Sequence, residues 1–251
     1  PAERIAPQAP DNDAVLAALE TRYGAFDPAL GQGLVGVALS LRNEQRHGEA
    51  SVLLRRALHI KRVNEGLHDP GQLDVLNLLI DSQEAAADWP GLNASYRYLY
   101  WLLRRNPDLP AEEVLNDLYR IGRWHLRAWD LDTGELAGRH LAEADAAFNM
   151  AAEAVARAEG EMSPALIEPL LGSALVNLRM ASYAQTADSR EDVRLMTAPE
   201  RAFLPEELER EEAVLQSYRD GRDALRRVVD IHRASPDLDD ERTAIALVYL
   251  A

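Results

Sequence analysis

Gly31, Gly33 and Gly36 have the G-x-G-x-x-G spacing that binds the pyrophosphate of a dinucleotide. Such a site needs a strand before the glycines and an acidic residue about 20 positions further on. Here Asp27-Pro28 precedes the glycines, and residues 55–56, where the acid is expected, are both arginine. We therefore expect the glycines to pack inside a helix, and we predict no cofactor.

The segment Asp130–Gly134 has the acidic and glycine residues of a calcium-binding loop. An EF-hand loop needs glycine at its sixth position and glutamate at its twelfth. Gly134 is fifth and Leu141 is twelfth, so we predict an ordinary turn between helices.

Six histidines are the remaining candidates for metal binding or acid–base chemistry. His140 and Glu143 are three residues apart on a predicted helix and could share a metal ion. A single pair on one helix is not a site, because a metal centre in a helix bundle takes ligands from several helices. We therefore expect the histidines to be solvated or to cap helices, and we predict no metal site.

The sequence contains no recognisable arrangement of residues for nucleophilic catalysis. Cysteine is absent, and no serine lies in a G-x-S-x-G elbow. Without a nucleophile, a base and an orienting group in a recognisable pattern, we predict no catalytic residues and a protein that is not an enzyme.

The composition narrows the possible partners. The 251-residue chain carries 42 acidic and 27 basic side chains, a formal net charge of −15. A surface for nucleic acid or an anionic membrane needs a basic face, so we expect neither partner. No apolar run approaches the roughly 18 residues of a membrane-spanning helix, so we expect no membrane insertion. The absence of cysteine and a Pro/Ala-rich start without methionine favour a bacterial periplasmic location, with the cytoplasm as the alternative.

The elements that must position any site are predicted to be helices, separated by recurring breaks. Gly24–Pro28, Gly66–Pro70 and Gly160–Pro164 share a glycine and, four residues later, a proline. Glycine suits the position just past a helix end, and proline suits the first turn of the next helix. The second break lies 42 residues after the first, and the third lies 94 residues further on. The spacing predicts stacked helix–turn–helix units that bury a core only together.

The side chains between the breaks also repeat. His47–Ala50, Leu53–Ile60, Gly66–Pro70 and Leu76–Leu79 together resemble a tetratricopeptide repeat of the 42-residue variety found in kinesin light chains and many bacterial proteins. The resemblance is good over 24–105 and partial over 106–185. It implies an all-α fold, a right-handed α-solenoid of antiparallel helix pairs. We expect the small residues of the repeat to be buried between helices, namely Ala50, Ala57, Ala144 and Ala151.

The predicted organisation has four parts. They are an N-terminal extension (1–12), TPR-like helical repeats (13–185), a polar inserted loop (186–204) and a further, truncated helical repeat (205–251). The predicted helices span 13–23, 29–43, 47–64, 71–86, 90–105, 111–129, 135–159, 165–185, 206–234 and 239–251. Alternatively, Gly221 splits the helix 206–234 into a pair of its own. We expect the apolar run 244–250 to pack against a continuation of the chain or against another chain.

The resemblance implies that the first helices of successive units line a concave groove. Their faces not used for packing carry the candidate partner-binding residues, Asp74, Asn77, Asp81 and Glu84 on 71–86, and Glu113, Asn116, Arg120 and Arg123 on 111–129. The resemblance further implies that Asn77 and Asn116 hydrogen-bond the backbone of an extended peptide, and Arg120 and Arg123 suit a carboxylate. The alternative is that the asparagines bridge neighbouring helices and the charges form a solvated face.

These expectations together predict a non-catalytic protein–protein interaction scaffold that binds a peptide or protein segment in the groove. One alternative is a structural or oligomerisation module whose groove is filled by its own continuation or by another copy. Another is the regulatory part of a larger enzyme. Self-association is compatible with these alternatives.

Overall fold

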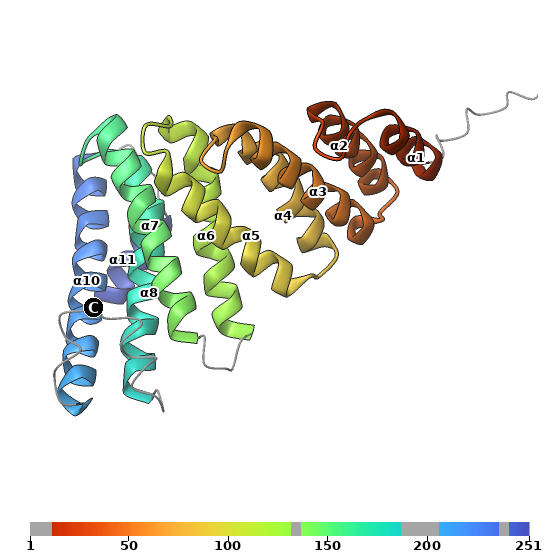
Figure 1. Ribbon diagram of the computed structural model, residues 1–251. Coiled ribbons are helices and arrows are strands. Elements are labelled where there is room, and N and C mark those ends of the chain that lie inside the picture. The colour runs from red at the N-terminus through yellow and green to blue at the C-terminus, as the bar shows by residue number, and fades with distance from the viewer. Residues whose placement is uncertain (1–11, 132–136, 187–205, 236–240, 251) are drawn as a thin grey trace, which may run out of the picture. The chain divides into compact units, whose positions relative to one another are not determined.

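The computed structural model describes residues 12–131, 137–186, 206–235 and 241–250. These residues form helices and turns with no strand, so the predicted all-α class is confirmed (Figure 1). The chain divides into two compact units, 1–108 and 109–251. Apart from Asn12 and Thr186, the predicted N-terminal extension and the predicted loop at 186–204 lie outside the described residues.

The described residues of the first unit form five α-helices whose ends follow from local capping. They are α1 (Asn12–Arg22), α2 (Pro28–Asn43), α3 (His47–Glu65), α4 (Leu73–Ala85) and α5 (Trp89–Arg105). A 3₁₀ turn, η1 (Pro70–Gln72), precedes α4. The Asp27 side chain accepts a hydrogen bond from the Ala29 amide at 2.8 Å, and Asp69 accepts one from the Gly71 amide at 2.7 Å. Each predicted helix end lies within two residues of the observed one.

One apolar cluster of the first unit joins α1, α2 and α3. Leu30, Leu34, Ala57 and Ile60 are buried together, and Leu19 packs against them. A Cβ atom on Gly31 would lie 3.2 Å from the Ile60 Cγ2, and one on Gly33 would lie 2.8 Å from Leu19. All three glycines lie inside α2 as expected, and Gly31 and Gly33 serve close helix packing, whereas a Cβ atom on Gly36 would meet nothing within 4 Å.

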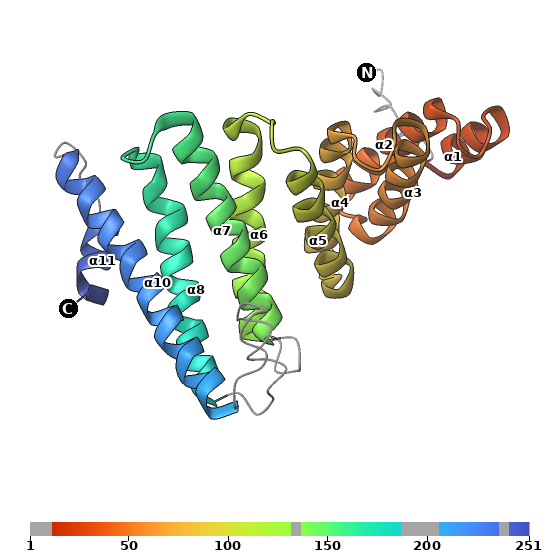
Figure 2. The ribbon, with the colours of Figure 1, turned by 60° about the vertical axis from the view of Figure 1, so that its left-hand side comes forward.

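The described residues of the second unit form five further helices. They are α6 (Ala111–Leu131), α7 (Ala137–Glu159), α8 (Ile167–Thr186), α10 (Glu206–Ala234) and α11 (Glu241–Leu250), with a 3₁₀ turn η2 (Pro164–Leu166) before α8. Figures 1 and 2 show α6, α7, α8 and α10 side by side. Gly160 has φ +97°, and the Ser163 hydroxyl accepts a hydrogen bond from the Ala165 amide at 3.1 Å. The glycine-to-proline break thus ends α7 and begins the next helix as predicted.

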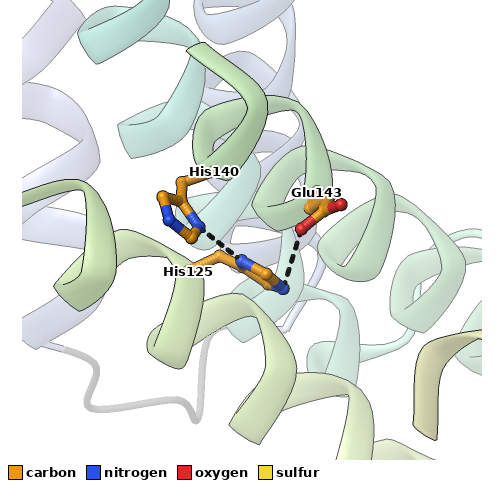
Figure 3. Close-up of side chains that lie close together, drawn as sticks. All are labelled: His125, His140 and Glu143. Atoms are coloured by element: carbon orange, nitrogen blue, oxygen red, sulfur yellow. Dashed lines mark hydrogen bonds and ion pairs between the residues drawn. The ribbon is translucent and has the colours of Figure 1, made fainter. Parts of the chain in front are cut away.

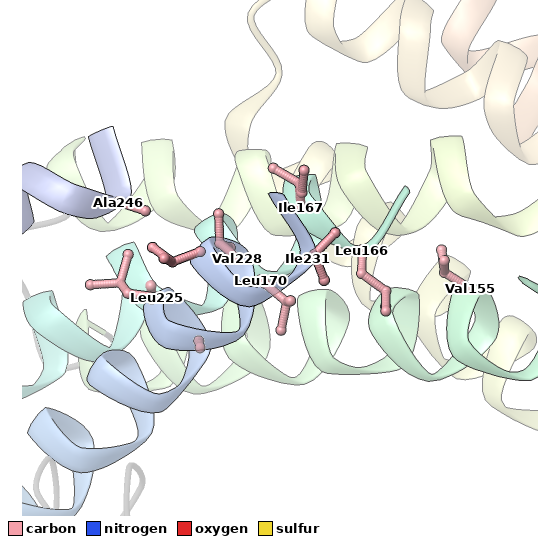
Figure 4. Packing of buried hydrophobic residues seen from close by; sticks show 11 residues of the cluster. Val155, Leu166, Ile167, Leu170, Leu225, Val228, Ile231 and Ala246 are labelled. Atoms are coloured by element: carbon pink, nitrogen blue, oxygen red, sulfur yellow. The ribbon is translucent and has the colours of Figure 1, made fainter. Parts of the chain in front are cut away.

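Two large apolar clusters lie in the described part of the second unit. In the first, shown in Figure 4, residues of α7, η2 and α8 meet Leu225, Val228 and Ile231 of α10 and Ala246 of α11. In the second, the Phe148 ring of α7 lies against two glycines. A Cβ atom on Gly122 of α6 or on Gly172 of α8 would lie 2.6 Å or 2.5 Å from that ring. The predicted packing alanines of both units, Ala50, Ala57, Ala144 and Ala151, are buried.

The alternative division of the long helix at Gly221 is wrong. Helix α10 continues through this position from Glu206 to Ala234. A Cβ atom on Gly221 would lie 3.3 Å from the Asn177 Cβ and 3.4 Å from the Ala174 carbonyl oxygen. The glycine therefore lets α10 approach α8 closely, rather than ending a helix.

The apolar run at the end of the chain is mostly exposed in this structure. Ile245, Leu247, Val248 and Tyr249 of α11 are exposed, whereas Ala246 is fully buried. Among the described helices, none is both long enough and apolar enough to cross a lipid bilayer.

Candidate functional site

The eight predicted partner-binding residues form one row on α4 and one row on α6. The rows have the same spacing, since positions 74, 77, 81 and 84 recur 39 residues later as 113, 116, 120 and 123. Asp74 and Glu84 of the α4 row are exposed, as are Glu113, Asn116 and Arg123 of the α6 row; Asn77, Asp81 and Arg120 are half-buried. None of the eight belongs to the core.

The opposite side of each helix explains why these rows face outward. Helix α4 buries Leu76, Leu79 and Ile80, and α6 buries Val114, Leu118 and Ile121. Burying those side chains turns the positions at 74, 77, 81 and 84, and their counterparts on α6, away from the core. The helical period is thus enough to place each row.

A matching row on α2 was missed in the sequence analysis. Subtracting the 42-residue period of the breaks from the α4 row gives Gln32, Val35, Leu39 and Arg42. The Arg42 guanidinium donates to the Asp81 carboxylate across a 3.3 Å gap, so the two rows are neighbours within the first unit. Leu39 is 41% exposed and adds an apolar side chain to a face otherwise rich in polar groups.

The α6 row belongs to the second unit, and the contact of its last residue is local. The Arg123 guanidinium donates from Nε to the Tyr119 carbonyl oxygen at 3.3 Å, one turn earlier on the same helix. That contact occupies one of the five N–H donors of the side chain. We expect the α4 and α6 rows to line a single groove. Because the two rows belong to different units, this stays a prediction.

A second cluster lies inside the α6–α7 pair. His125 of α6 points toward His140 and Glu143 of α7, as Figure 3 shows. The Nδ1 atoms of the two rings are 2.9 Å apart, and His125 Nε2 is 3.3 Å from Glu143 Oε2. Arg139 donates from Nε to the other carboxylate oxygen of Glu143 at 3.0 Å.

The distances fix the proton arrangement once Glu143 is ionised. An ionised carboxylate only accepts hydrogen bonds, so His125 Nε2 must carry the hydrogen that it donates to Glu143. A neutral His125 then has a bare Nδ1, which accepts the hydrogen of His140 Nδ1. An ionised Glu143 also accepts a charge-assisted hydrogen bond from the guanidinium of Arg139.

The expectation of solvated or capping histidines is wrong for His125 and His140. Their exposed fractions are 1% and 4%. His125 lies four residues after Ile121, and His140 lies four residues before Ala144, so both occupy the buried stripe of their helix. The same helical period that predicts the core would have placed both histidines inside it.

The comparisons with known proteins identify no family. No protein-family model and no curated protein matches the chain. Among solved structures, the crystal structure of BtubC (BKLC) from P. vanneervenii matches at a TM-score of 0.39 and 13% sequence identity, covering 96% of this chain and 90% of that one. At this TM-score the match has no weight, so the all-α class rests on the helices themselves.

Proposed function

We propose that this protein is a non-catalytic helical-repeat scaffold that binds an extended peptide or protein segment on the exposed rows of its first helices. The observation that supports the proposal is the recurrence of an outward-facing polar row at identical spacing on α4 and α6. Each row lies on the side of its helix away from the buried apolar side chains. A ligand that runs across successive helices would meet equivalent groups at each step.

The chemistry of the rows indicates the kind of ligand. The amide of an asparagine side chain both donates and accepts, which suits the N–H and C=O groups of an extended backbone. Arg120 and Arg123 suit an acidic side chain, whereas Asp74, Glu84 and Glu113 suit a basic one. Leu39 offers an apolar contact beside the α4 row. The expected ligand is therefore an extended segment of mixed charge with at least one apolar side chain.

The test begins with a peptide-display library selected on the intact chain, followed by affinity measurement with one enriched peptide. The double variant Asn77→Ala, Asn116→Ala should lose roughly 1–3 kcal/mol of binding free energy, because backbone groups of the peptide lose their partners. Asn149→Ala, which changes an exposed asparagine on the second helix α7, is the matched control and should bind as the wild type does.

Thermal unfolding of the same variants separates binding from support of the fold. The double variant should unfold at nearly the wild-type temperature, because Asn116 is exposed and Asn77 is only half-buried. Normal peptide binding combined with a lower unfolding temperature would mean that the asparagines bridge helices, and it would contradict the proposed site.

A further inference from the structure

We infer that His125, His140 and Glu143 form a binding site for one divalent transition-metal ion of the Zn²⁺ type, which joins α6 to α7. One ligand atom from each residue can be chosen so that all three lie within 4.8 Å of one another. Three protein ligands of this kind, two imidazoles and one carboxylate, leave a fourth position for water in a tetrahedral site. The inference is independent of the proposed peptide-binding rows.

The ligand chemistry selects the class of metal. Imidazole nitrogen suits Zn²⁺, Cu²⁺, Ni²⁺ and Co²⁺, whereas Mg²⁺ and Ca²⁺ prefer sites made of oxygen. The cluster offers a nitrogen from each ring and a single carboxylate, so it fits the first group and not the second. Both histidines are buried, and a metal ion binds the neutral form of each ring.

The two imidazoles already share one hydrogen where the metal would bind. Their Nδ1 atoms face each other at 2.9 Å, so one must be protonated and the other bare. For a metal ion to bind here, His140 gives up the hydrogen on Nδ1 and takes a proton from solvent on Nε2, so that the ring stays neutral. Each Nδ1 then donates its lone pair to the ion. At metal–ligand distances of about 2.0–2.2 Å, tetrahedral ligand atoms lie about 3.4 Å apart, so the rings need to separate only slightly.

Glu143 completes the site through a short rotation of its side chain. Its present contact with His125 Nε2, at 3.3 Å, is longer than the histidine pair, and the side chain is 22% exposed. The carboxylate can therefore turn toward the ion without displacing core residues. Its negative charge offsets part of the charge of the ion, whereas the neighbouring Arg139 opposes binding.

Two substitutions that break the same Arg139–Glu143 ion pair test whether Glu143 is a metal ligand or only a structural partner of Arg139. Glu143→Gln removes the negative oxygen ligand, and Arg139→Gln removes only its cationic partner. Both retain a side chain of similar size at a half-buried position, so both should fold. A third variant, His232→Gln on α10, is the control for loss of a histidine outside the cluster.

The experiment measures Zn²⁺ binding by equilibrium dialysis and Co²⁺ binding by the visible absorption of the tetrahedral complex, using the intact chain and the metal salt alone. The wild type should bind one ion per chain, its unfolding temperature should rise with Zn²⁺, and Mg²⁺ should have no effect. Glu143→Gln should weaken Zn²⁺ binding more than about 100-fold, beyond the 10–100-fold that an outer-shell partner contributes. Arg139→Gln should bind as tightly as the wild type or several-fold tighter, and His232→Gln should bind normally.

Three results would contradict the inferred metal site or its ligands. No saturable binding of one ion by the wild type would overturn the site. A loss below 100-fold in Glu143→Gln would overturn the assignment of Glu143 as a ligand. Equal losses in Glu143→Gln and Arg139→Gln would mean that the residues only form a structural ion pair. Because 22% of the Glu143 side chain is exposed, the test stays valid even if substitution of a buried histidine unfolds the chain.

Discussion

At the scale of single residues, Ala57 lies where two helices pack too closely to accept a larger side chain. It is buried among Leu30, Leu34 and Ile60 in the contact between α2 and α3. Ala57→Leu should overpack this contact and lower the free energy of unfolding by about 1–3 kcal/mol, as measured by urea titration. Val52→Leu, on the exposed side of the same helix, is the control and should have little effect. Wild-type stability in Ala57→Leu would mean that the contact is loose.

Asp145 is a residue whose burial makes stability depend on pH. It accepts hydrogen bonds from Ser173 Oγ at 2.9 Å, from Asn177 Nδ2 at 3.0 Å and from Asn149 Nδ2 at 2.8 Å. Burial raises the pKa of the Asp145 carboxyl above its ordinary value, and the hydrogen bonds from Ser173 and Asn177 oppose this only in part. The folded protein therefore retains a proton on Asp145 at a pH where the unfolded chain has already lost it.

The sign of the expected effect follows from that difference in proton binding. The unfolding free energy of the wild type should fall as pH rises through the folded-state pKa, because the buried carboxylate then carries its charge at a cost. Asp145→Asn removes the charge and retains an acceptor oxygen for Ser173 and Asn177. Urea titrations between about pH 4 and pH 7 should thus show the wild type losing stability relative to the variant. Parallel curves for the two proteins would show that Asp145 does not carry the effect.

At the scale of elements, the glycines around Phe148 set the distance between α7 and its neighbours. A methyl group at Gly172 would overlap the Phe148 ring, whereas one at Gly36 of α2 would meet nothing within 4 Å. Gly172→Ala should therefore lower thermal stability, although alanine favours a helix by about 1 kcal/mol. Gly36→Ala, the control with open space, should stabilise by up to that amount.

A double substitution identifies the clash as the cause. Phe148→Leu should partly rescue Gly172→Ala, because the smaller side chain leaves room for the new methyl group. A double-mutant cycle of unfolding free energies measures this coupling. Strictly additive effects would show that the two residues act separately, and that the spacing of α7 and α8 does not depend on their contact.

At the scale of the whole molecule, charge repulsion opposes folding. The formal net charge is −15, and the described ion pairs are mostly exposed, so each contributes about 0–1 kcal/mol. Raising NaCl from about 10 mM to about 150 mM shortens the screening length from roughly 30 Å to roughly 8 Å. The unfolding temperature, followed by circular dichroism, should therefore rise.

Sucrose at the same osmolarity is the control for this salt effect, and the rise with NaCl should exceed the small stabilisation that an excluded osmolyte gives. A fall with added NaCl would mean that attractive pairs such as Arg42–Asp81 outweigh the overall repulsion.

The sequence alone determined the helices and their order, because the signals are local. Asp27, Asp69 and Ser163 cap their helices with their own side chains, and Gly66 and Gly160 adopt the positive φ that ends a helix. The helical period likewise separated Leu76 and Leu118, which are buried, from Asp74 and Asn116, which are exposed. Such patterns depend on neighbours within a few residues, so no tertiary information is needed to interpret them.

Only the tertiary structure decided which side chains meet across helices. His125 and His140 are 15 residues apart, Arg42 and Asp81 are 39 apart, and Gly122 and Gly172 approach Phe148 from two different helices. The repeat pattern specifies which helices are neighbours, but not how far one helix is shifted along another. That shift depends on how all the packed side chains fit together. The histidine–glutamate cluster depends on the shift and could not be predicted from the sequence, whereas the outward-facing rows depend only on the helical period and could be predicted.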